Sequence, residues 1–184
     1  MNNARLAAVR TWSVRLLAAE LLVLIATGVA LYVWYRPQAG TAWDAPGLRV
    51  DRGIEAMFVV RDVHAVTTIV FLLTASVAAV AHLLAGTRGR AAASAGIVLL
   101  GAAAGFTGLL LPWDQLALWA VTIGEDFSGY RWLSGADSVR FVIIDDSQVG
   151  LATLRRWFVV HVGLTIVAAV VLALLLRRAR RERR

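Results

Sequence analysis

The stretch Val63–Ala85, VHAVTTIVFLLTASVAAVAHLLA, decides the fold class of this chain. It contains no Asp, Glu, Lys or Arg, and it is longer than the roughly 20 apolar residues that a helix needs to cross the hydrocarbon core of a bilayer. Backbone amides find no water inside lipid, so the segment must satisfy them within its own helix despite its β-branched residues. The stretch therefore predicts a transmembrane helix.

Three further apolar stretches of similar length occur along the chain. They are Ser13–Tyr35, Ala91–Leu111 and Trp157–Leu176. The sequence of 184 residues is 59% hydrophobic and only 17% charged, which is too apolar for a soluble enzyme of this size. We therefore expect an all-α integral membrane protein, in which residues 1–184 form one bundle of four transmembrane helices with two long outer loops.

The distribution of arginine predicts how the bundle sits in the membrane. The chain has nineteen arginines, no lysine and twelve acidic residues, which gives a net charge of +7. The arginines are not expected to form one basic face, as they would in a nucleic-acid binder. Eleven arginines lie in residues 1–15, in Gly86–Arg90 and in the tail 177–184, whereas loops 36–62 and 112–156 hold eight arginines against ten acids. Positive residues mark the inner side. We therefore expect a multi-pass protein of the plasma membrane with both termini cytoplasmic and a basic tail facing anionic lipid.

The two outer loops are long for a compact helical protein, and connections of this length usually carry a function. Within the second loop, residues 113–123 and 138–144 stay rather apolar. These two segments predict short helices at the membrane interface. The mixed charges of both loops suit a docking surface, on which charges fix the orientation of a partner.

The absence of cysteine excludes disulfides, iron–sulfur clusters, thiolate zinc sites and thioether-linked haem. Any metal must therefore be held by nitrogen or oxygen. The three histidines are candidates, because an ionisable side chain inside a span is costly. They are His64, His82 and His161. A single histidine in a membrane helix can equally serve only to bond a neighbouring helix.

His64 and His161 differ from a lone histidine because each lies near the start of a span that runs inward from the outer side. They are expected at a similar depth, where two imidazoles from facing helices can occupy both axial positions of a haem iron. Ligation by two histidines leaves no open iron site, which suits electron transfer rather than oxygen chemistry. The pattern therefore predicts a haem near the outer surface.

Small residues are expected where the faces of a porphyrin meet the helix backbone, since a side chain would fill the slot. Gly28 and Gly108 lie on the two spans that run outward, at positions that reach the depth of His64. Arg61 and Arg156 lie just before the two histidines and are candidates to pair with the haem propionates. The alternative for both arginines is that they snorkel to the membrane interface.

Several short motifs give the chain a resemblance to a known family. The most specific is Thr107–Gln115, TGLLLPWDQ, followed by the similar Leu118-Trp119-Ala120. The others are Thr27-Gly28, Tyr35-Arg36-Pro37, Arg61-Asp62-Val63-His64, Val149-Gly150 and the segment Thr153–Phe158 that leads into His161. From about Thr27 to Leu176, the chain resembles the N-terminal, haem-binding half of cytochrome b, and in particular the short split-chain form, cytochrome b6.

The resemblance implies that His64 and His161 ligate the haem on the outer, electropositive side of the membrane. Members of the family bind a second haem near the cytoplasmic side through two more histidines on the second and fourth helices. Those positions, fourteen residues after the first pair, hold Ala78 and Leu175 next to Leu176, and none of these can ligate iron. The matching inner glycine positions hold Val14 and Ser94. This departure predicts one haem b, not two.

His82 leaves a second possibility open on the inner side. It lies eighteen residues after His64, which is five helical turns, so it shares the same face about 27 Å deeper. It could hold an inner haem together with a ligand from another chain, lie at the interface, or handle protons near an inner quinone site. Glu20, an acid within the first span, could take part in the same proton chemistry or pair with an arginine.

By the resemblance, the chain is the haem subunit of a larger redox complex, a part of a quinol-linked oxidoreductase and not a complete enzyme. The expected partners are membrane lipid, quinone or quinol, and a Rieske protein, a c-type cytochrome or another extracytoplasmic oxidoreductase. The family's outer quinol site uses a PEWY segment that does not occur in this sequence. Either a separate subunit supplies it, or electrons pass without it. The alternative function is a non-redox four-helix membrane anchor or assembly subunit.

Overall fold

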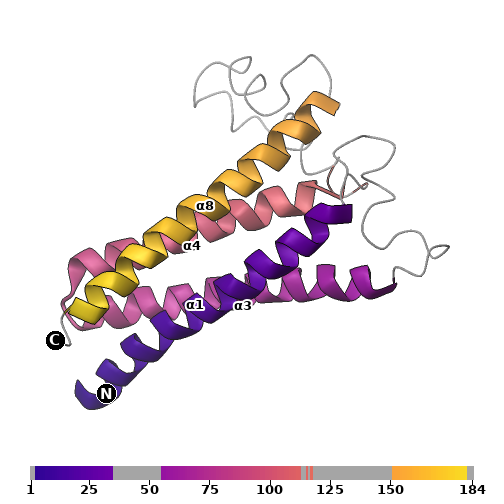
Figure 1. The fold of residues 1–184 in the computed structure, drawn as a ribbon. Coiled ribbons are helices and arrows are strands. Elements are labelled where there is room, and N and C mark those ends of the chain that lie inside the picture. The colour runs from indigo at the N-terminus through magenta and orange to yellow at the C-terminus, as the bar shows by residue number, and fades with distance from the viewer. Residues whose placement is uncertain (1–2, 35–54, 113–114, 116, 118–150, 182–184) are drawn as a thin grey trace, which may run out of the picture.

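Long helices make up nearly all of the chain that the computed structural model describes, which comprises residues 3–34, 55–112, 115, 117 and 151–181. The helices are α1 (Asn3–Trp34), α3 (Glu55–Leu84), α4 (Arg88–Leu110) and α8 (Leu151–Arg181). They run lengthwise through one bundle, and both marked termini lie at the same end of it (Figure 1). The prediction of an all-α fold is confirmed.

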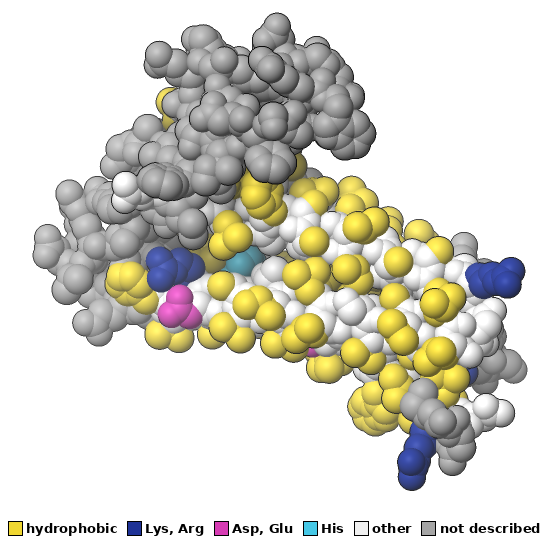
Figure 2. All heavy atoms as spheres, turned by 180° about the vertical axis from the view of Figure 1, so that it is seen from behind, with side chains coloured by type: hydrophobic (Ala, Val, Ile, Leu, Met, Phe, Trp, Pro, Cys, Tyr) yellow, Lys and Arg dark blue, Asp and Glu magenta, His cyan; other side chains and the backbone are white. Residues whose placement is uncertain are grey.

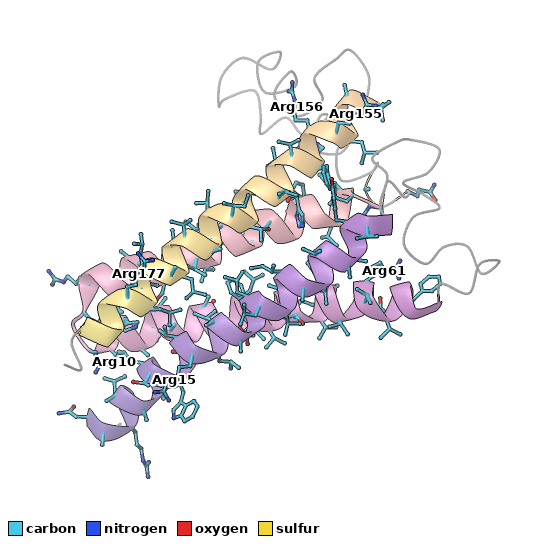
Figure 3. The ribbon with its side chains drawn as sticks, viewed as in Figure 1. Arg10, Arg15, Arg61, Arg155, Arg156 and Arg177 are labelled. Atoms are coloured by element: carbon cyan, nitrogen blue, oxygen red, sulfur yellow. The ribbon has the colours of Figure 1, made fainter. Side chains whose placement is uncertain are left out.

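Arginines mark both ends of the bundle. We call the end that holds the two termini the terminal end, and the opposite end the loop end. Figure 3 shows Arg10, Arg15 and Arg177 at the terminal end and Arg61, Arg155 and Arg156 at the loop end. Consecutive helices among the four run in opposite directions (Figure 1), which is the up-and-down arrangement expected from the sequence.

Each of the four described helices is long and apolar enough to cross a membrane. Hydrophobic side chains cover the flank of the bundle between its two arginine-bearing ends (Figure 2). Leu22, Leu73 and Val159, from three different helices, are each more than half exposed. An apolar surface of this extent suits lipid rather than water, so the chain is a multi-pass membrane protein.

The helices extend beyond the predicted spans. Helix α1 begins at Asn3 and not at Ser13, and α8 runs from Leu151 through Arg181 and not from Trp157 to Leu176. The 32 residues of α1 measure about 48 Å at 1.5 Å per residue, against a hydrocarbon core of about 30 Å. Hydropathy reports only the part of a helix that lies in lipid, whereas backbone hydrogen bonding continues into the polar flanks.

Small residues of α4 let α3 approach closely. A Cβ atom at Gly101 would lie 3.0 Å from Cδ2 of Leu72 and 3.3 Å from the ring of Phe71, and one at Gly105 would lie 3.3 Å from Cγ2 of Thr68. Gly101 and Gly105 are four residues apart and form the small-xxx-small pattern that brings helix backbones together in membranes. This contact sets how α3 and α4 are positioned along each other's axes.

The turn between α3 and α4 is closed by a glycine with a positive φ. Gly86 has φ 70°, its N–H donates to the carbonyl of Leu83 at 2.9 Å, and the N–H of Thr87 donates to the carbonyl of His82 at 3.0 Å. These two bonds form a Schellman motif, in which glycine adopts the left-handed conformation at little cost. The short turn makes α3 and α4 antiparallel neighbours.

Apolar side chains fill the half of the bundle nearer the terminal end. The buried cluster comprises Val14, Leu17, Leu21, Phe71, Ala75, Ala78, Ile97, Leu172 and Leu175. All four helices contribute to it, and Leu17, Ala75, Ala78 and Ile97 have no exposed surface at all. This cluster is the hydrophobic core of the described part of the chain.

The short interfacial helices predicted at residues 113–123 and 138–144 fall outside the described residues, apart from Gln115 and Ala117. These two residues have helical backbone. The tail predicted at 177–184 is helical as far as Arg181.

Candidate functional site

Helices α3 and α8 bring His64 and His161 together in the half of the bundle nearer the loop end. Their ring centroids lie 6.3 Å apart, and the ring planes are inclined by 56°. Both side chains are half-buried. The sequence placed the two histidines at one depth because their spans run in the same direction, and the structure brings them into this juxtaposition.

A threonine on α1 holds the His64 ring through Nδ1. The hydroxyl of Thr27 lies 2.8 Å from Nδ1 of His64, and the same hydroxyl lies 2.7 Å from the carbonyl of Val23, to which it donates. Since a hydroxyl has one proton, Thr27 accepts from an Nδ1–H. Nε2 of His64 then carries the lone pair that a metal requires.

The carbonyl of Ala104 on α4 holds the His161 ring in the same way. It lies 2.8 Å from Nδ1 of His161, and a carbonyl oxygen can only accept, so this nitrogen carries the proton. The Thr107 hydroxyl lies 3.1 Å from the same nitrogen while donating to the backbone of its own helix. Nε2 of His161 is therefore also left as the lone-pair nitrogen.

Each histidine packs against a glycine on the helix opposite. A Cβ atom at Gly108 would lie 3.0 Å from Cε1 of His161, and one at Gly28 would lie 3.4 Å from Cε1 of His64. A Cβ atom at Gly108 would press against the imidazole ring, whereas one at Gly28 would make an ordinary contact. A larger side chain at either position would enter the space beside the ring. The two predicted glycines thus lie at the site, each facing one of the two histidines.

The spacing of the histidine pair fits a metal that binds between them. An imidazole nitrogen lies about 2 Å from a bound metal and about 1 Å from its own ring centre, so two ligating rings have centres roughly 6 Å apart. No third His, Cys, Asp or Glu joins the pair within the described residues. Two axial imidazoles are nevertheless sufficient for a haem iron, because the porphyrin supplies the other ligands. These residues fit a haem, and ligation itself stays a prediction.

Two aromatic contacts lie close to the histidines and join α8 to its neighbours. The rings of Tyr32 and Phe158 stack at 5.8 Å between α1 and α8, and Phe106 meets Trp157 edge to face at 6.2 Å between α4 and α8. Each of these residues lies within about a turn of one of the site residues along its helix. Tyr32 and Phe106 remain 60% and 48% exposed, so these contacts join the helices beside the histidine pair without sealing it.

The two predicted arginines lie at the loop end on the same helices as the histidines (Figure 3). Arg61 pairs with its neighbour Asp62 at 3.4 Å, and its guanidinium lies 5.4 Å from the centroid of the Phe58 ring. An ion pair this exposed contributes little to stability and is easily exchanged for another anion. Arg156 is half-buried near the start of α8. The role of both residues toward a haem propionate stays a prediction.

The positions that would hold a second pair of ligands belong to the apolar cluster. Ala78 and Leu175 are buried within it, and the inner glycine positions hold the buried Val14 and Ser94. His82 is also buried, and its Nδ1 lies 3.0 Å from the hydroxyl of Thr87, which donates to the His82 carbonyl. Nδ1 of His82 therefore forms a hydrogen bond within the turn between α3 and α4.

Glu20 forms a buried hydrogen bond in the terminal half of the bundle. The hydroxyl of Thr74 on α3 donates to Oε1 of Glu20 at 2.8 Å, and both side chains are more than 90% buried. Oε2 of Glu20 is buried without a hydrogen-bond partner among the described residues. The partner found for Glu20 is thus a threonine and not the arginine that the sequence left as an alternative.

Thr74→Val is expected to destabilise the bundle by about 1–3 kcal/mol, because it leaves both buried oxygens of Glu20 without a donor. Ser76→Ala is the matched control, since the exposed Ser76 hydroxyl only donates to the Leu72 carbonyl of its own helix. Thermal unfolding in detergent micelles measures both variants. Equal losses in the two variants would show that the Glu20 contact contributes nothing.

Sequence reasoning missed the hydroxyl and carbonyl groups that hold the two rings. Thr27 and Thr107 each directly precede a site glycine, and Ala104 lies one turn before Gly108. The repeated Thr-Gly pair was visible in the sequence and marks both positions. The contribution of a backbone carbonyl such as that of Ala104 has no sequence signal, because every residue carries one.

Comparisons with known proteins agree with this architecture. The family model described as cytochrome b/b6/petB matches residues 6–181. Cytochrome b of Neurospora crassa is 32% identical over 85% of the chain, and cytochrome b6 of Bigelowiella natans is 29% identical over 76% of it. The menaquinol:cytochrome c reductase cytochrome b subunit of Geobacillus thermodenitrificans is 41% identical over 32% of the chain.

The chain spans only part of these relatives. The matches cover 42% of the Neurospora protein, 66% of the Bigelowiella protein and 26% of the Geobacillus protein. The family model, in contrast, extends over nearly the whole chain and all four described helices. The sequence motifs, the paired histidines with their glycines and these matches agree, and the chain belongs to the cytochrome b/b6 family.

Proposed function

We propose that the chain binds one haem b between the helix pairs α1–α3 and α4–α8, with His64 and His161 as its axial ligands, and that it serves as a membrane electron-transfer subunit. One observation carries this proposal: both rings are held through Nδ1, which leaves Nε2 of each for iron. Gly28 and Gly108 beside the rings keep the adjacent space free of side chains.

The packing of the terminal half supports one haem rather than two. The cluster that includes Ala78 and Leu175 contains no side chain able to ligate iron, and its residues are closely packed. Admitting a porphyrin would require Phe71, Leu172 and their neighbours to move apart, and protein interiors resist such rearrangement. The redox centre of the subunit is then confined to the loop side of the membrane.

A haem with both axial positions occupied supplies a one-electron couple and no open coordination position. The chain's own residues then have three tasks. His64 and His161 fix the position of the iron, the ring contacts Tyr32–Phe158 and Phe106–Trp157 hold α8 against α1 and α4 beside the site, and Arg61 and Arg156 pair with propionates at the loop end. No residue of this site is assigned to bond-making or bond-breaking chemistry.

The distribution of arginine supports a location in the plasma membrane with both termini on the cytoplasmic side. The loop end then faces outward, and single electrons pass between membrane quinol and an extracytoplasmic partner near loops 36–62 and 112–156. A Rieske protein, a c-type cytochrome or another oxidoreductase fits this role. The similarity to the Geobacillus protein, a menaquinol:cytochrome c reductase cytochrome b subunit, supports a quinol and a cytochrome as the electron donor and acceptor.

A spectroscopic experiment on the purified chain tests this function. Dithionite is expected to produce a b-type absorption band, and a reduced menaquinol analogue is expected to produce a substantial part of the same band. A membrane anchor without redox function would give no band with either reductant. A band with dithionite alone would reject quinol as the donor and leave the haem assignment intact. Subunits that copurify in mild detergent identify the partner.

A further inference from the structure

The histidine site is built from two copies of the same arrangement. In one half, Thr27 and Gly28 on α1 face His64 on α3; in the other, Thr107 and Gly108 on α4 face His161 on α8. In both halves the threonine hydroxyl contacts Nδ1 and the following glycine packs against Cε1. The two helix pairs thus hold their histidines by the same pair of residue types.

A second pair of threonines is also shared by the two halves of the site, but its hydroxyls contact backbone carbonyls and not the histidine rings. Thr68 and Thr165 lie four residues after the two histidines, and their hydroxyls donate to the backbone carbonyls of His64 and His161 at 2.9 and 3.0 Å. These bonds lie within one helix and do not reach the rings. They therefore provide matched controls for the threonines that do.

The two ring contacts are unequal. At His64 the Thr27 hydroxyl at 2.8 Å is the close partner, with the Leu24 backbone as an additional one. At His161 the Ala104 carbonyl at 2.8 Å is closer than the Thr107 hydroxyl at 3.1 Å. Removal of the hydroxyl therefore takes away the main partner of one ring and only the secondary partner of the other.

We propose that Thr27 and Thr107 are positioning residues that hold the Nδ1–H tautomer of the two axial histidines and thereby set the reduction potential of the bound haem, with Thr27 having the larger effect. An acceptor at Nδ1–H increases the electron density on Nε2 and favours the oxidised metal. It also fixes the orientation of each ring, which is inclined by 56° to the other. The inference rests on the haem assignment proposed above.

The test compares Thr27→Val with Thr27→Ser and with Thr68→Val by redox titration of the b-type band. Thr27→Val is expected to raise the midpoint potential, so that the ratio of reduced to oxidised haem at a given potential rises roughly three- to tenfold, tenfold being about 59 mV for one electron. Thr27→Ser and Thr68→Val are expected to keep the wild-type value. Thr107→Val is expected to produce a smaller shift in the same direction.

Electron paramagnetic resonance of the oxidised protein provides a second readout, because its g values depend on the angle between the two imidazole planes. A change in Thr27→Val that serine restores supports a positioning role. The same holds if Thr27→Val loses haem and Thr27→Ser retains it. An unchanged potential and spectrum in Thr27→Val, or a serine variant that behaves like valine, would overturn the inference. A wild-type chain without haem would instead reject the proposed function.

Discussion

His161→Ala and His64→Ala are each expected to reduce haem content at least tenfold. Within the described residues the two rings are the only pair of imidazoles placed to share one metal, with centroids 6.3 Å apart. Loss of either leaves one axial position without its ligand and a cavity beside the opposing glycine. Replacing even an outer-shell partner of a metal ligand commonly costs ten- to a hundredfold in affinity, and loss of the ligand itself costs more. The pyridine haemochrome assay, normalised to chain concentration, measures the loss.

His82→Gln is the control for both variants. Its ring is buried at the other end of α3 and contacts Thr87, and glutamine keeps a hydrogen-bonding group in the turn. Full haem content is expected in this variant. A haem signal that survives His161→Ala, or one that disappears only in His82→Gln, would contradict the site assignment.

Gly108→Val is expected to abolish haem binding while the four helices still form. The first added atom, Cβ, already lies 3.0 Å from Cε1 of His161, so the ring must give way by a few tenths of an ångström even before the methyl groups are placed. The two methyl groups of valine also occupy the space that the glycine leaves beside the ring. Overpacking of this kind costs typically 1–3 kcal/mol even in an ordinary core, and at this position it displaces a ligand.

Gly96→Val on the same helix is the matched control, because a Cβ atom there meets nothing within 4 Å. It is expected to keep the wild-type haem content. Circular dichroism and size-exclusion chromatography in detergent show whether both variants fold alike. Equal haem content in the two valine variants would mean that the space beside His161 is not needed by a cofactor.

The fold was predictable because lipid leaves the backbone few choices. Any apolar stretch as long as Val63–Ala85 must form a helix, so four such stretches predict four helices from composition alone. The ends of these helices were not predictable in the same way. Asn3 and Leu151 begin their helices several residues outside the apolar stretches, because hydrogen bonding continues where hydropathy has already fallen.

The depth of the candidate site followed from counting residues, since a helix rises by a constant 1.5 Å per residue. That rise placed Gly28 and Gly108 at the level of the histidines. Counting did not reveal which glycine faces which histidine, because this depends on how α1 and α8 are rotated about their axes. It also did not reveal the Thr74 partner of Glu20, which depends on side-chain direction across two packed helices.

The number of haems per purified chain tests the central claim most directly. The pyridine haemochrome assay, combined with amino-acid analysis of the same sample, is expected to give one haem b per chain. A value near two would contradict the claim that the close packing of Ala78, Leu175 and their neighbours leaves room for only one haem. A value near zero in protein purified from membranes with ample haem would contradict the assignment of His64 and His161 and the electron-transfer function with it.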